Sequence, residues 1–154
     1  SSNILYNAKL SRASFNDKIF LFKLANDPQV IKNSLSNKSI NLKEHEKWFE
    51  KTIKKENSKI LIFQTSKHKL GQIRFDKISK NKTLITYSVA NEFRGRNIGY
   101  KMLNLAFRKN LFKTPLYAIV KKSNEASNNI FRKLGFEILK NYQKNNFIYY
   151  LKKN

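Results

Sequence analysis

The sequence contains no cysteine, which excludes disulfide bridges and thiolate metal sites. Its two histidines, His45 and His68, lie far apart and lack the spacing of metal ligands, so we predict no bound metal. Apolar runs such as 60–63 have the length of a strand and fall far short of a membrane span. Residues 1–9 lack the basic and apolar segments of a secretory signal. The length of 154 residues predicts a single domain over residues 1–154. The lack of a secretory signal and of a membrane span predicts a cytoplasmic protein with no membrane partner.

Acidic residues are also scarce: 10 Asp and Glu stand against 32 Lys and Arg, which gives a net charge of +22. Such a charge is typical of proteins that bind nucleic-acid phosphates. Here, however, most of the charge comes from lysines scattered over every segment, and arginine is limited to positions 12, 74, 94, 96, 108 and 132. This distribution favours a solvated basic surface over a nucleic-acid site. The excess charge is still expected to attract small anionic ligands.

The first third of the chain predicts a strand and three helices. Residues 4–10 alternate as in a strand. Residues 14–26 carry a helical apolar stripe that stops before Pro28, because proline disfavours helix in the preceding residue. A short helix is predicted over 28–34, with Pro28 at its first position. Asn41 and Glu44 have the spacing of a capping box, and the helix that they start is predicted to run to about residue 56.

The rest of the chain predicts the elements of one mixed sheet. Apolar runs and alternation predict strands over 59–65, 71–78 and 83–90, and the short polar turns between them indicate an antiparallel meander. Helices are predicted over 98–112 and 125–134, the second ended by Gly135. A strand over 115–121 lies between them, and a hairpin over 136–142 and 147–151 closes the chain. Helices on both faces of one sheet are the natural packing for this order of elements.

Two of the four glycines, Gly95 and Gly99, lie between a predicted strand and a predicted helix. Glycine lets the backbone approach a ligand closely, and a helix start offers free N–H groups and the positive end of the helix dipole. With Arg94, Arg96 and Lys101 nearby, this loop has the chemistry of a diphosphate site. A plain strand-to-helix turn, in which glycine only relieves strain, explains the same residues if the loop is considered alone.

Two segments together resemble the hallmarks of the GCN5-related N-acetyltransferase (GNAT) family. Residues 94–99, Arg-Gly-Arg-Asn-Ile-Gly, resemble its Arg/Gln-x-x-Gly-x-Gly/Ala loop, and residues 124–136 resemble its Asn-x-x-(Ser/Ala)-x-x-x-(Tyr/Phe)-x-x-x-Gly-Phe segment. The resemblance implies the GNAT fold, of the α/β (α+β) class, with a mixed, mostly antiparallel sheet of about six to seven strands and about four helices on both faces. It also implies an N-acetyltransferase that uses acetyl-CoA, and it is compatible with a homodimer, because family members often pair.

The resemblance assigns three groups of residues to the binding of acetyl-CoA. The backbone that pairs with the pantetheine arm and polarises the thioester carbonyl is that of Ser88, Val89 and Ala90. The pyrophosphate loop comprises Arg94, Gly95, Arg96, Asn97, Ile98, Gly99 and Tyr100. Asn124 contacts the arm of the cofactor, and Ser127 and Phe131 face the same channel.

Two residues depart from the family pattern. Asn97 stands where the family usually has glycine. After glycine, Asn is the residue that most readily adopts a left-handed backbone conformation. We therefore expect the loop to fit the pyrophosphate less well, but not to lose that fit. Phe131 stands where many members carry a tyrosine that protonates the leaving thiolate, so water or another group must assist that departure.

The N-terminal part resembles a branch of the family that acetylates nucleotide-linked amino sugars, as in pseudaminic acid synthesis. The resemblance rests on residues 26–34, 44–49 and 71–76. The basic surface suits the diphosphate of such an anionic small-molecule acceptor, and it disfavours polyamines and basic protein tails. Acetylation of protein N-termini and a non-catalytic basic binding module are the alternatives.

The acceptor amine must be unprotonated when it attacks the thioester. His45 is the first candidate for the base, because imidazole titrates near neutral pH, although a histidine on the inner face of an amphipathic helix often has only a packing role. Tyr87 is a second catalytic candidate, which orients the acceptor or relays a proton, with core packing as its alternative. Arg74 and Asp76 share one strand face and, with His45, are candidates for binding the acceptor; a simple surface ion pair is the alternative.

Overall fold

The computed structural model describes Leu5, residues 7–139 and residues 146–153. Within these residues the chain forms five α-helices and one seven-stranded sheet, which confirms the predicted fold class. The five helices match the five predicted from the residue patterns, one more than the family resemblance implied. The helices are α1 (Lys18–Ala25), α2 (Pro28–Asn33), α3 (Leu42–Ile53), α4 (Ile98–Arg108) and α5 (Glu125–Lys133). The strands are β1 (Lys9–Arg12), β2 (Ser58–Gln64), β3 (Lys69–Ser79), β4 (Lys82–Val89), β5 (Leu116–Lys121), β6 (Glu137–Ile138) and β7 (Phe147–Lys152).

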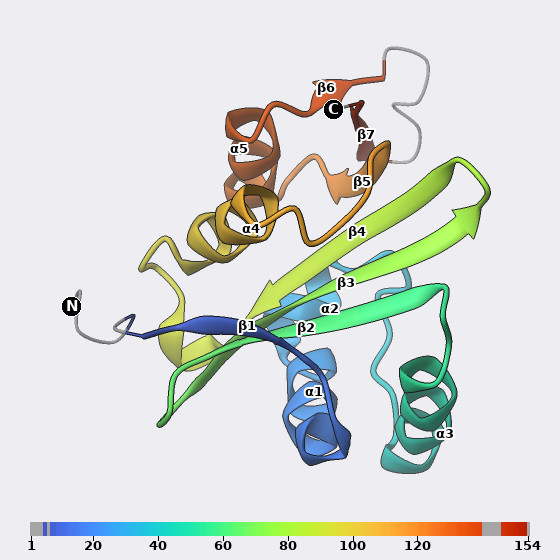
Figure 1. Cartoon of the computed structure of the whole chain (residues 1–154), viewed down its shortest axis with the longest axis vertical. Helices are drawn as coiled ribbons and strands as arrows, with labels where there is room; N and C mark the ends of the chain where they lie inside the picture. Colours follow the sequence, from blue (N-terminus) through green and yellow to red (C-terminus); the bar gives the residue numbers. More distant parts are fainter. Residues whose placement is uncertain (1–4, 6, 140–145, 154) are drawn as a thin grey trace.

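The strands lie in the order β1-β2-β3-β4-β5-β7-β6 (Figure 1). Neighbouring strands are antiparallel except β4 and β5, which are parallel. β3 and β4 pair along nearly their whole length, whereas β4 and β5 pair only near their starts, Thr83 with Leu116 and Leu84 with Tyr117. The sheet is therefore split between β4 and β5 toward the C-terminal ends of these two strands.

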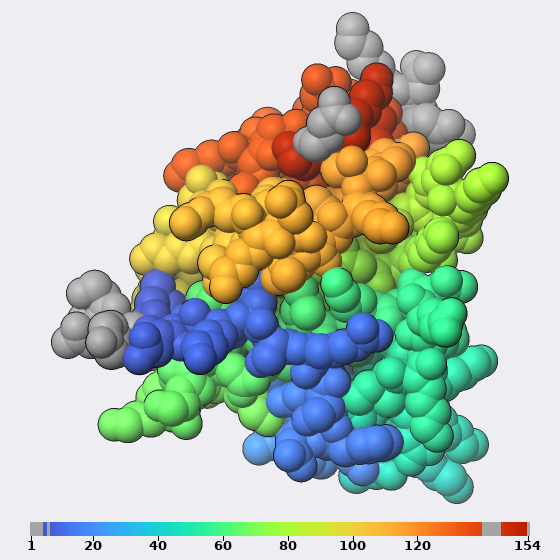
Figure 2. All heavy atoms as spheres, in the orientation of Figure 1, coloured from blue at the N-terminus to red at the C-terminus, as the bar shows by residue number. Residues whose placement is uncertain are grey.

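Alternation along β2 divides the apolar core between the two faces of the sheet. Leu61 and Phe63 pack in a cluster with residues of α4 and α5, whereas Ile60 and Ile62 pack in a second cluster with residues of α1 and α3. In Figure 2 the chain from α4 onward (yellow to red) covers one part of the visible surface, and the N-terminal segments (blue to green) cover the other. The helices therefore lie on both faces of the sheet, as predicted.

The first strand begins later than predicted. β1 starts at Lys9 rather than at residue 4, and it continues to Arg12. Asn7 has a left-handed backbone with φ of 58°, and the N–H of Ala8 bonds to the C=O of Leu5 at 3.0 Å. This turn interrupts the extended chain before β1, so the predicted bounds of the strand are wrong; residues 1–4 and 6 lie outside the described residues.

The predicted helix over 98–112 is also shorter than expected. α4 ends at Arg108, and Asn110 takes a left-handed conformation with φ of 52°. The N–H of Leu111 then bonds to the C=O of Ala106 at 3.1 Å, a bond typical of a helix end with a left-handed residue. The apolar pattern continues beyond this point because Phe112 stacks on the sheet rather than extending the helix.

α2 and α3 begin where the sequence predicts. The Asp27 side chain caps α2 by accepting from the N–H groups of Gln29 at 3.0 Å and Val30 at 3.2 Å. Asn41 caps α3 by accepting from the N–H of Glu44 at 2.8 Å. The Glu44 carboxylate bonds to the side-chain amide of Asn41 at 3.0 Å, rather than to its backbone as the capping box predicts. α3 ends at residue 53, somewhat before the predicted end.

The C-terminal elements follow the predicted order. Gly135 has φ of 89° and follows the end of α5. β6 and β7 form the predicted hairpin, with Glu137 opposite Leu151, while residues 140–142 of the predicted first strand lie outside the described residues. No helix in the described part of the chain is long and apolar enough to cross a membrane.

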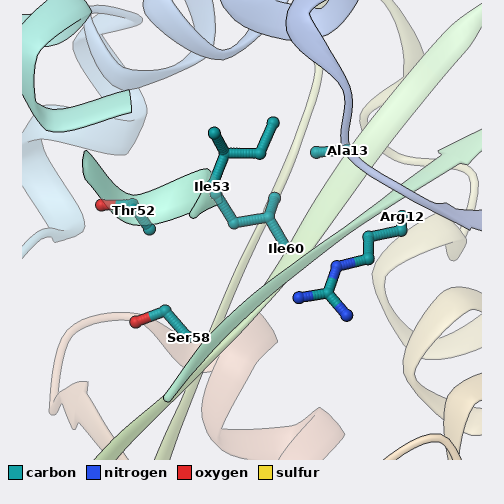
Figure 3. A pocket seen from close by; sticks show the side chains of 6 residues that line it. All are labelled: Arg12, Ala13, Thr52, Ile53, Ser58 and Ile60. Carbon is teal, nitrogen blue, oxygen red and sulfur yellow. The ribbon is translucent and has the colours of Figure 1, made fainter. Parts of the chain in front are cut away.

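A small hollow of about 10 Å³ lies between β1, β2 and the end of α3 (Figure 3). Its lining residues are Arg12, Ala13, Thr52, Ile53, Ser58 and Ile60. A volume of this size holds no more than about one water molecule. The hollow is therefore too small for a nucleotide, and β1 and β2 lie on the far side of β3 from the split.

Candidate active site

The split between β4 and β5 opens one edge of β4 near its end. The N–H of Ala90 bonds to the C=O of Leu70 on the β3 side at 2.8 Å. Because the backbone groups of successive residues in a strand point to opposite edges, those of Val89 and Tyr87 point toward the split. The ladder with β5 has already stopped at Leu84. This edge is therefore open to an extended ligand, and within the predicted thioester segment 88–90 it is Val89 whose backbone faces the split.

The loop between β4 and α4 has the backbone shape expected of a phosphate loop. Gly95 has φ of 80° and Asn97 has φ of 60°, both in the left-handed region. Asn97 thus adopts the conformation predicted for it in place of glycine. Among the described residues, no side chain caps α4 at its start. The N–H groups of its first turn therefore have no side-chain acceptor and can bind an anion, and the positive end of the helix dipole lies beside them.

The basic side chains of this loop differ in their partners. Arg94 donates from Nη2 to Asp27 at 2.7 Å and from Nη1 to Asn91 at 3.0 Å, so both of its terminal nitrogens are occupied. Arg96 and Lys101 form no ion pair with any described residue. The loop therefore presents two unpaired cations, and Arg94, which was predicted to grip phosphate, holds the start of α2 in this structure.

The segment from Asp27 to Asn37 contacts residues on both sides of the split. Asp27 pairs with Arg94, which follows β4. Lys121, at the end of β5, donates from Nζ to the C=O of Lys32 and, at 3.5 Å, to Oδ1 of Asn37. The two attachment points belong to opposite sides of the split, so α2 bridges the diverging ends of β4 and β5.

Gly99 allows close packing between α4, β4 and α5. A Cβ atom at this position would lie 3.0 Å from a ring carbon of Tyr87 and 3.2 Å from Cδ1 of Ile130. These distances are shorter than ordinary van der Waals contact. Gly99 is therefore needed for close approach, whereas Gly95 is needed for its backbone conformation.

Tyr87 and Ser127 join β4 to α5 beside the split. Tyr87 Oη lies 2.5 Å from Ser127 Oγ, and the Tyr87 ring meets the ring of Phe131 edge-on, with centroids 5.8 Å apart. Burial raises the pKa of Tyr87 above its ordinary value, and the hydrogen bond with Ser127 offsets part of that rise. The phenol is therefore protonated at neutral pH. Phe131 is only 2% exposed and packs in the core, so the predicted contact of its ring with the cofactor is not supported by exposed surface.

Asn124 and Asn128 fix the turn between β5 and α5. Asn124 Oδ1 accepts from the N–H of Ser127 at 3.2 Å, so this side chain caps α5. Asn128 is 4% exposed; it donates to the C=O groups of Lys121 at 2.9 Å and Asn124 at 2.8 Å, and it accepts from Tyr150 Oη at 2.6 Å. Sequence reasoning missed Asn128, although a second polar residue beside Ser127 on the inner face of an amphipathic helix is a usable signal.

His45 lies in the core between α1 and α3. It is 1% exposed, and its Nε2–H donates to the C=O of Lys18 at 3.0 Å. Its ring centroid lies 5.3 Å from that of Phe22 and 5.5 Å from that of Trp48. Burial lowers the pKa of His45 below its ordinary value in spite of this hydrogen bond. A ring enclosed in this way presents no surface to an acceptor, which argues against His45 as a base and as an acceptor-binding residue.

The opposite face of the sheet carries polar groups at the end of β4. Gln72 Nε2 donates to Ser88 Oγ at 3.0 Å, and Arg74 Nε lies 2.7 Å from Asp76 Oδ2 on the same strand face. Because side chains alternate along β4, Ser88 points to the face of α3 while Tyr87 points to the face of α4. The end of β4 is therefore polar on both faces.

The arrangement can bind a diphosphate at the loop, pair with an extended ligand along β4, and hold a proton at Tyr87 beside the split. Within the described residues, no group of three or more histidines and carboxylates is placed to hold a metal ion.

Comparisons with known proteins agree with this geometry. The acetyltransferase (GNAT) domain family matches residues 9–137, and a search of functionally curated proteins found no matching sequence. The spermidine N-acetyltransferase from Vibrio cholerae, solved in complex with CoA and spermine, has a TM-score of 0.79 at 15% identity and covers 95% of this chain and 96% of its own. The ribosomal-protein-alanine N-acetyltransferase from Brucella melitensis has a TM-score of 0.75 at 18% identity, covering 95% of this chain and 99% of its own.

The N-acetyltransferase PseH from Campylobacter jejuni has a TM-score of 0.69 at 18% identity and covers 96% of this chain and 98% of its own. At these identities the solved structures establish the fold alone. The family match spans most of the sequence, and the chain therefore belongs to the acetyltransferase (GNAT) domain family.

Proposed function

We propose that this N-acetyltransferase uses acetyl-CoA to acetylate the amino group of a nucleotide-linked amino sugar. The observation that carries the proposal is the loop over 94–99, with left-handed backbone at Gly95 and Asn97, placed beside the split between β4 and β5. An uncapped helix start, two unpaired cations and an open strand edge meet there. Each suits one part of a diphosphate ligand with an extended arm.

Acetyl-CoA supplies an activated thioester when it is bound. In our proposal, the N–H groups at the start of α4 and the side chains of Arg96 and Lys101 hold its diphosphate. The open edge of β4, at Tyr87 and Val89, pairs with its arm. The backbone N–H of Val89 faces the split and is the candidate donor to the oxyanion that forms on the thioester carbonyl.

In the transfer, the amine nitrogen bonds to the carbonyl carbon, the carbon–sulfur bond breaks, and the sulfur leaves with the electron pair. Many family members have a tyrosine at the position of Phe131. Since this chain lacks that hydroxyl, Tyr87 is our candidate for the group that stabilises the leaving sulfur. Because a phenol is less acidic than a thiol, Tyr87 keeps its proton and acts as a hydrogen-bond donor. A sugar amine is weakly basic, since oxygens flank it, so solvent is sufficient to remove the proton of the attacking nitrogen.

Charge and sequence support the amino-sugar acceptor. The net charge of +22 attracts the diphosphate of a nucleotide sugar and repels a polyamine. Residues 26–34, which carry the resemblance to the amino-sugar branch, include the helix that bridges the split. Since acetyl-CoA is a cytoplasmic metabolite, we place the reaction in the cytoplasm.

The acetyl-CoA site is tested by thermal unfolding with and without the ligand. Millimolar acetyl-CoA is expected to raise the melting temperature, and Arg96→Gln is expected to reduce that rise. Arg108→Gln is the matched control, because it removes the same charge from an exposed position at the other end of α4. An unchanged melting temperature of the wild type would refute the cofactor site.

The acceptor is tested by release of CoA thiol over a panel of amines. The chain has no cysteine, so a thiol reagent reports only the product. We expect turnover with a UDP-linked amino sugar and little with spermidine or with N-terminal peptides. Turnover with the peptides instead would favour the N-terminal acetyltransferase. No thiol release with any amine, together with salt-sensitive binding of nucleic acid, would favour the non-catalytic module.

A further inference from the structure

Arg74 holds its guanidinium in a fixed orientation on β3. Its Nε donates to Asp76 Oδ2 at 2.7 Å, and its Cζ lies 5.3 Å from the centroid of the Trp48 ring in α3. Asp76 is itself held, because Ser58 Oγ donates to its other oxygen at 2.9 Å. One edge and one face of the guanidinium are thereby occupied, which restricts both its position and its plane.

The other edge of this guanidinium is free. Among the described residues, every hydrogen bond and ion pair of Arg74 is made by Nε, and both terminal nitrogens have no partner. The side chain is 31% exposed. Arg94 is the opposite case, since both of its terminal nitrogens are engaged. Two parallel N–H donors on a fixed plane match the two oxygens of a phosphate or carboxylate.

The free edge belongs to a polar strip that leads to the end of β4. Arg74 pairs with Thr86 across the sheet, and Gln72 pairs with Ser88, all on the face that carries α3. At a rise of about 3.3 Å per residue, Val89 lies roughly 10 Å along the strand from the level of Arg74. A ligand that covers this strip spans the distance from the guanidinium to the predicted thioester segment.

We propose that Arg74 is the anchor for an oxyanion of the acceptor, with Asp76, Ser58 and Trp48 as positioning residues. The inference rests on the proposed acetyl transfer and narrows its substrate class. The acceptor carries a phosphate or carboxylate, separated from its amine by about the length of the strip. In a nucleotide-linked amino sugar, the diphosphate fills this role and the sugar amine reaches the end of β4.

Kinetics with matched acceptors test the anchor. For Arg74→Gln we expect the KM of a UDP-linked amino sugar to rise at least tenfold, with the KM of the same amino sugar without its nucleotide unchanged and kcat little affected. Arg74→Lys keeps the charge but loses the planar pair of donors, so it should show most of the same loss. Lys77→Gln is the matched control, because it removes one charge from an exposed position on the same strand and should change neither KM.

An amino sugar that carries a carboxylate separates the two oxyanions. If Arg74→Gln raises its KM but not that of the UDP-linked sugar, the carboxylate is the ligand; the reverse assigns the diphosphate. An equal effect on charged and uncharged acceptors, or no effect on any, would overturn the anchor. The single variant Arg74→Gln leaves the Asp76 carboxylate without its cation, whereas the double variant Arg74→Gln with Asp76→Asn leaves no unpaired carboxylate. If the rise in KM comes from the lost guanidinium and not from misfolding, the double variant should show the same rise.

Direct binding separates this inference from the proposed function. UDP is titrated by calorimetry into the protein saturated with acetyl-CoA, which blocks the phosphate loop. We expect binding to the wild type and at least tenfold weaker binding to Arg74→Gln. Equal, measurable binding of UDP to both proteins contradicts the anchor, and so does no binding to either protein when the carboxylate-bearing sugar is also unaffected by Arg74→Gln. Failure of the proposed function would appear elsewhere, as the absence of thiol release with every amine.

Discussion

Asp27 accepts a hydrogen bond from Nη2 of Arg94 at 2.7 Å, with the two side chains 15% and 21% exposed. The same carboxylate caps α2 through the N–H groups of Gln29 and Val30. One acidic side chain therefore joins the helix that bridges the split to the loop proposed for the diphosphate. A carboxylate in this position competes with phosphate for the same guanidinium.

Replacing Asp27 with Asn should free Arg94 while keeping α2 capped, because Asn and Asp cap helices equally well. We expect the free energy of unfolding to fall by about 1 kcal/mol, since the ion pair is only partly screened from solvent. We also expect the affinity for acetyl-CoA to rise several-fold. Urea unfolding and calorimetry measure the two effects. Asp27→Ala, which also removes the cap, should cost about 1 kcal/mol more; unchanged affinity in both variants would mean that Arg94 does not meet the diphosphate.

The stability that Asp27 provides should depend on pH. Burial raises the pKa of this carboxyl, but hydrogen bonds from Arg94 and the helix N–H groups, with the Arg94 charge, outweigh burial and hold the pKa below its ordinary value of 3.8. The contribution is therefore complete above the unfolded pKa and is lost as the pH falls through the folded pKa. The stability difference between wild type and Asp27→Asn should be constant from about pH 7 to 5 and shrink below about pH 4. Urea unfolding over this range checks it, and a difference that persists undiminished at about pH 2 would contradict it.

Gly99→Val should disturb the site by overpacking. The added side chain meets the Tyr87 ring and Ile130 at distances that leave no space, so we expect a loss of about 1–3 kcal/mol in the free energy of unfolding and a smaller thermal shift with acetyl-CoA. Gly95→Ala is the informative comparison, because its Cβ meets nothing within 4 Å. It should cost about 1–2 kcal/mol through its left-handed backbone alone. If Gly99→Val changes neither the free energy of unfolding nor the thermal shift, α4 can move away from β4 without disturbing the site.

Tyr87→Phe should slow acetyl transfer without disturbing the packing against Phe131. We expect kcat to fall roughly tenfold to a hundredfold, the effect of losing one hydrogen bond to a charged group, with the thermal shift by acetyl-CoA unchanged. The loss should be smaller for an acetyl thioester of a more acidic thiol, which needs less stabilisation as it leaves. If both thioesters lose the same factor, the hydroxyl has only a structural role.

Asn128→Leu should be among the most destabilising changes in α5. It leaves the hydroxyl of Tyr150, a fully buried residue, without its acceptor. The C=O groups of Lys121 and Asn124 lose the side-chain amide and keep only the backbone N–H groups of Asn124 and Asn128 as donors. We expect a loss of about 3 kcal/mol in the free energy of unfolding. Tyr150→Phe should cost about 1–2 kcal/mol, and the double variant should cost less than the sum, since the two side chains share one bond. If urea unfolding shows that the double variant loses the full sum of the two single losses, the hydrogen bond between Tyr150 and Asn128 does not contribute to stability.

The sequence by itself determined the features that depend on near neighbours. The cap at Asn41, the left-handed backbone at Asn97 and the end of α5 at Gly135 all lie where the residue types predict them. Each rests on hydrogen bonds or steric limits within about one helical turn. The pairing of β2, β3 and β4 and of β6 and β7 could also be predicted, because short turns join antiparallel neighbours. The parallel pairing of β4 with β5 and the position of β7 between β5 and β6 could not.

Only the tertiary structure decided which of these side chains are free to act. His45 meets the C=O of Lys18 across 27 residues and is buried, and Arg94 meets Asp27 across 67 residues and is paired. Arg74 also forms an ion pair, with Asp76, yet among the described residues neither of its terminal nitrogens has a partner. A residue type fixes what a side chain can bind, but its partner depends on how distant elements pack, and a pattern read along one segment does not contain that packing.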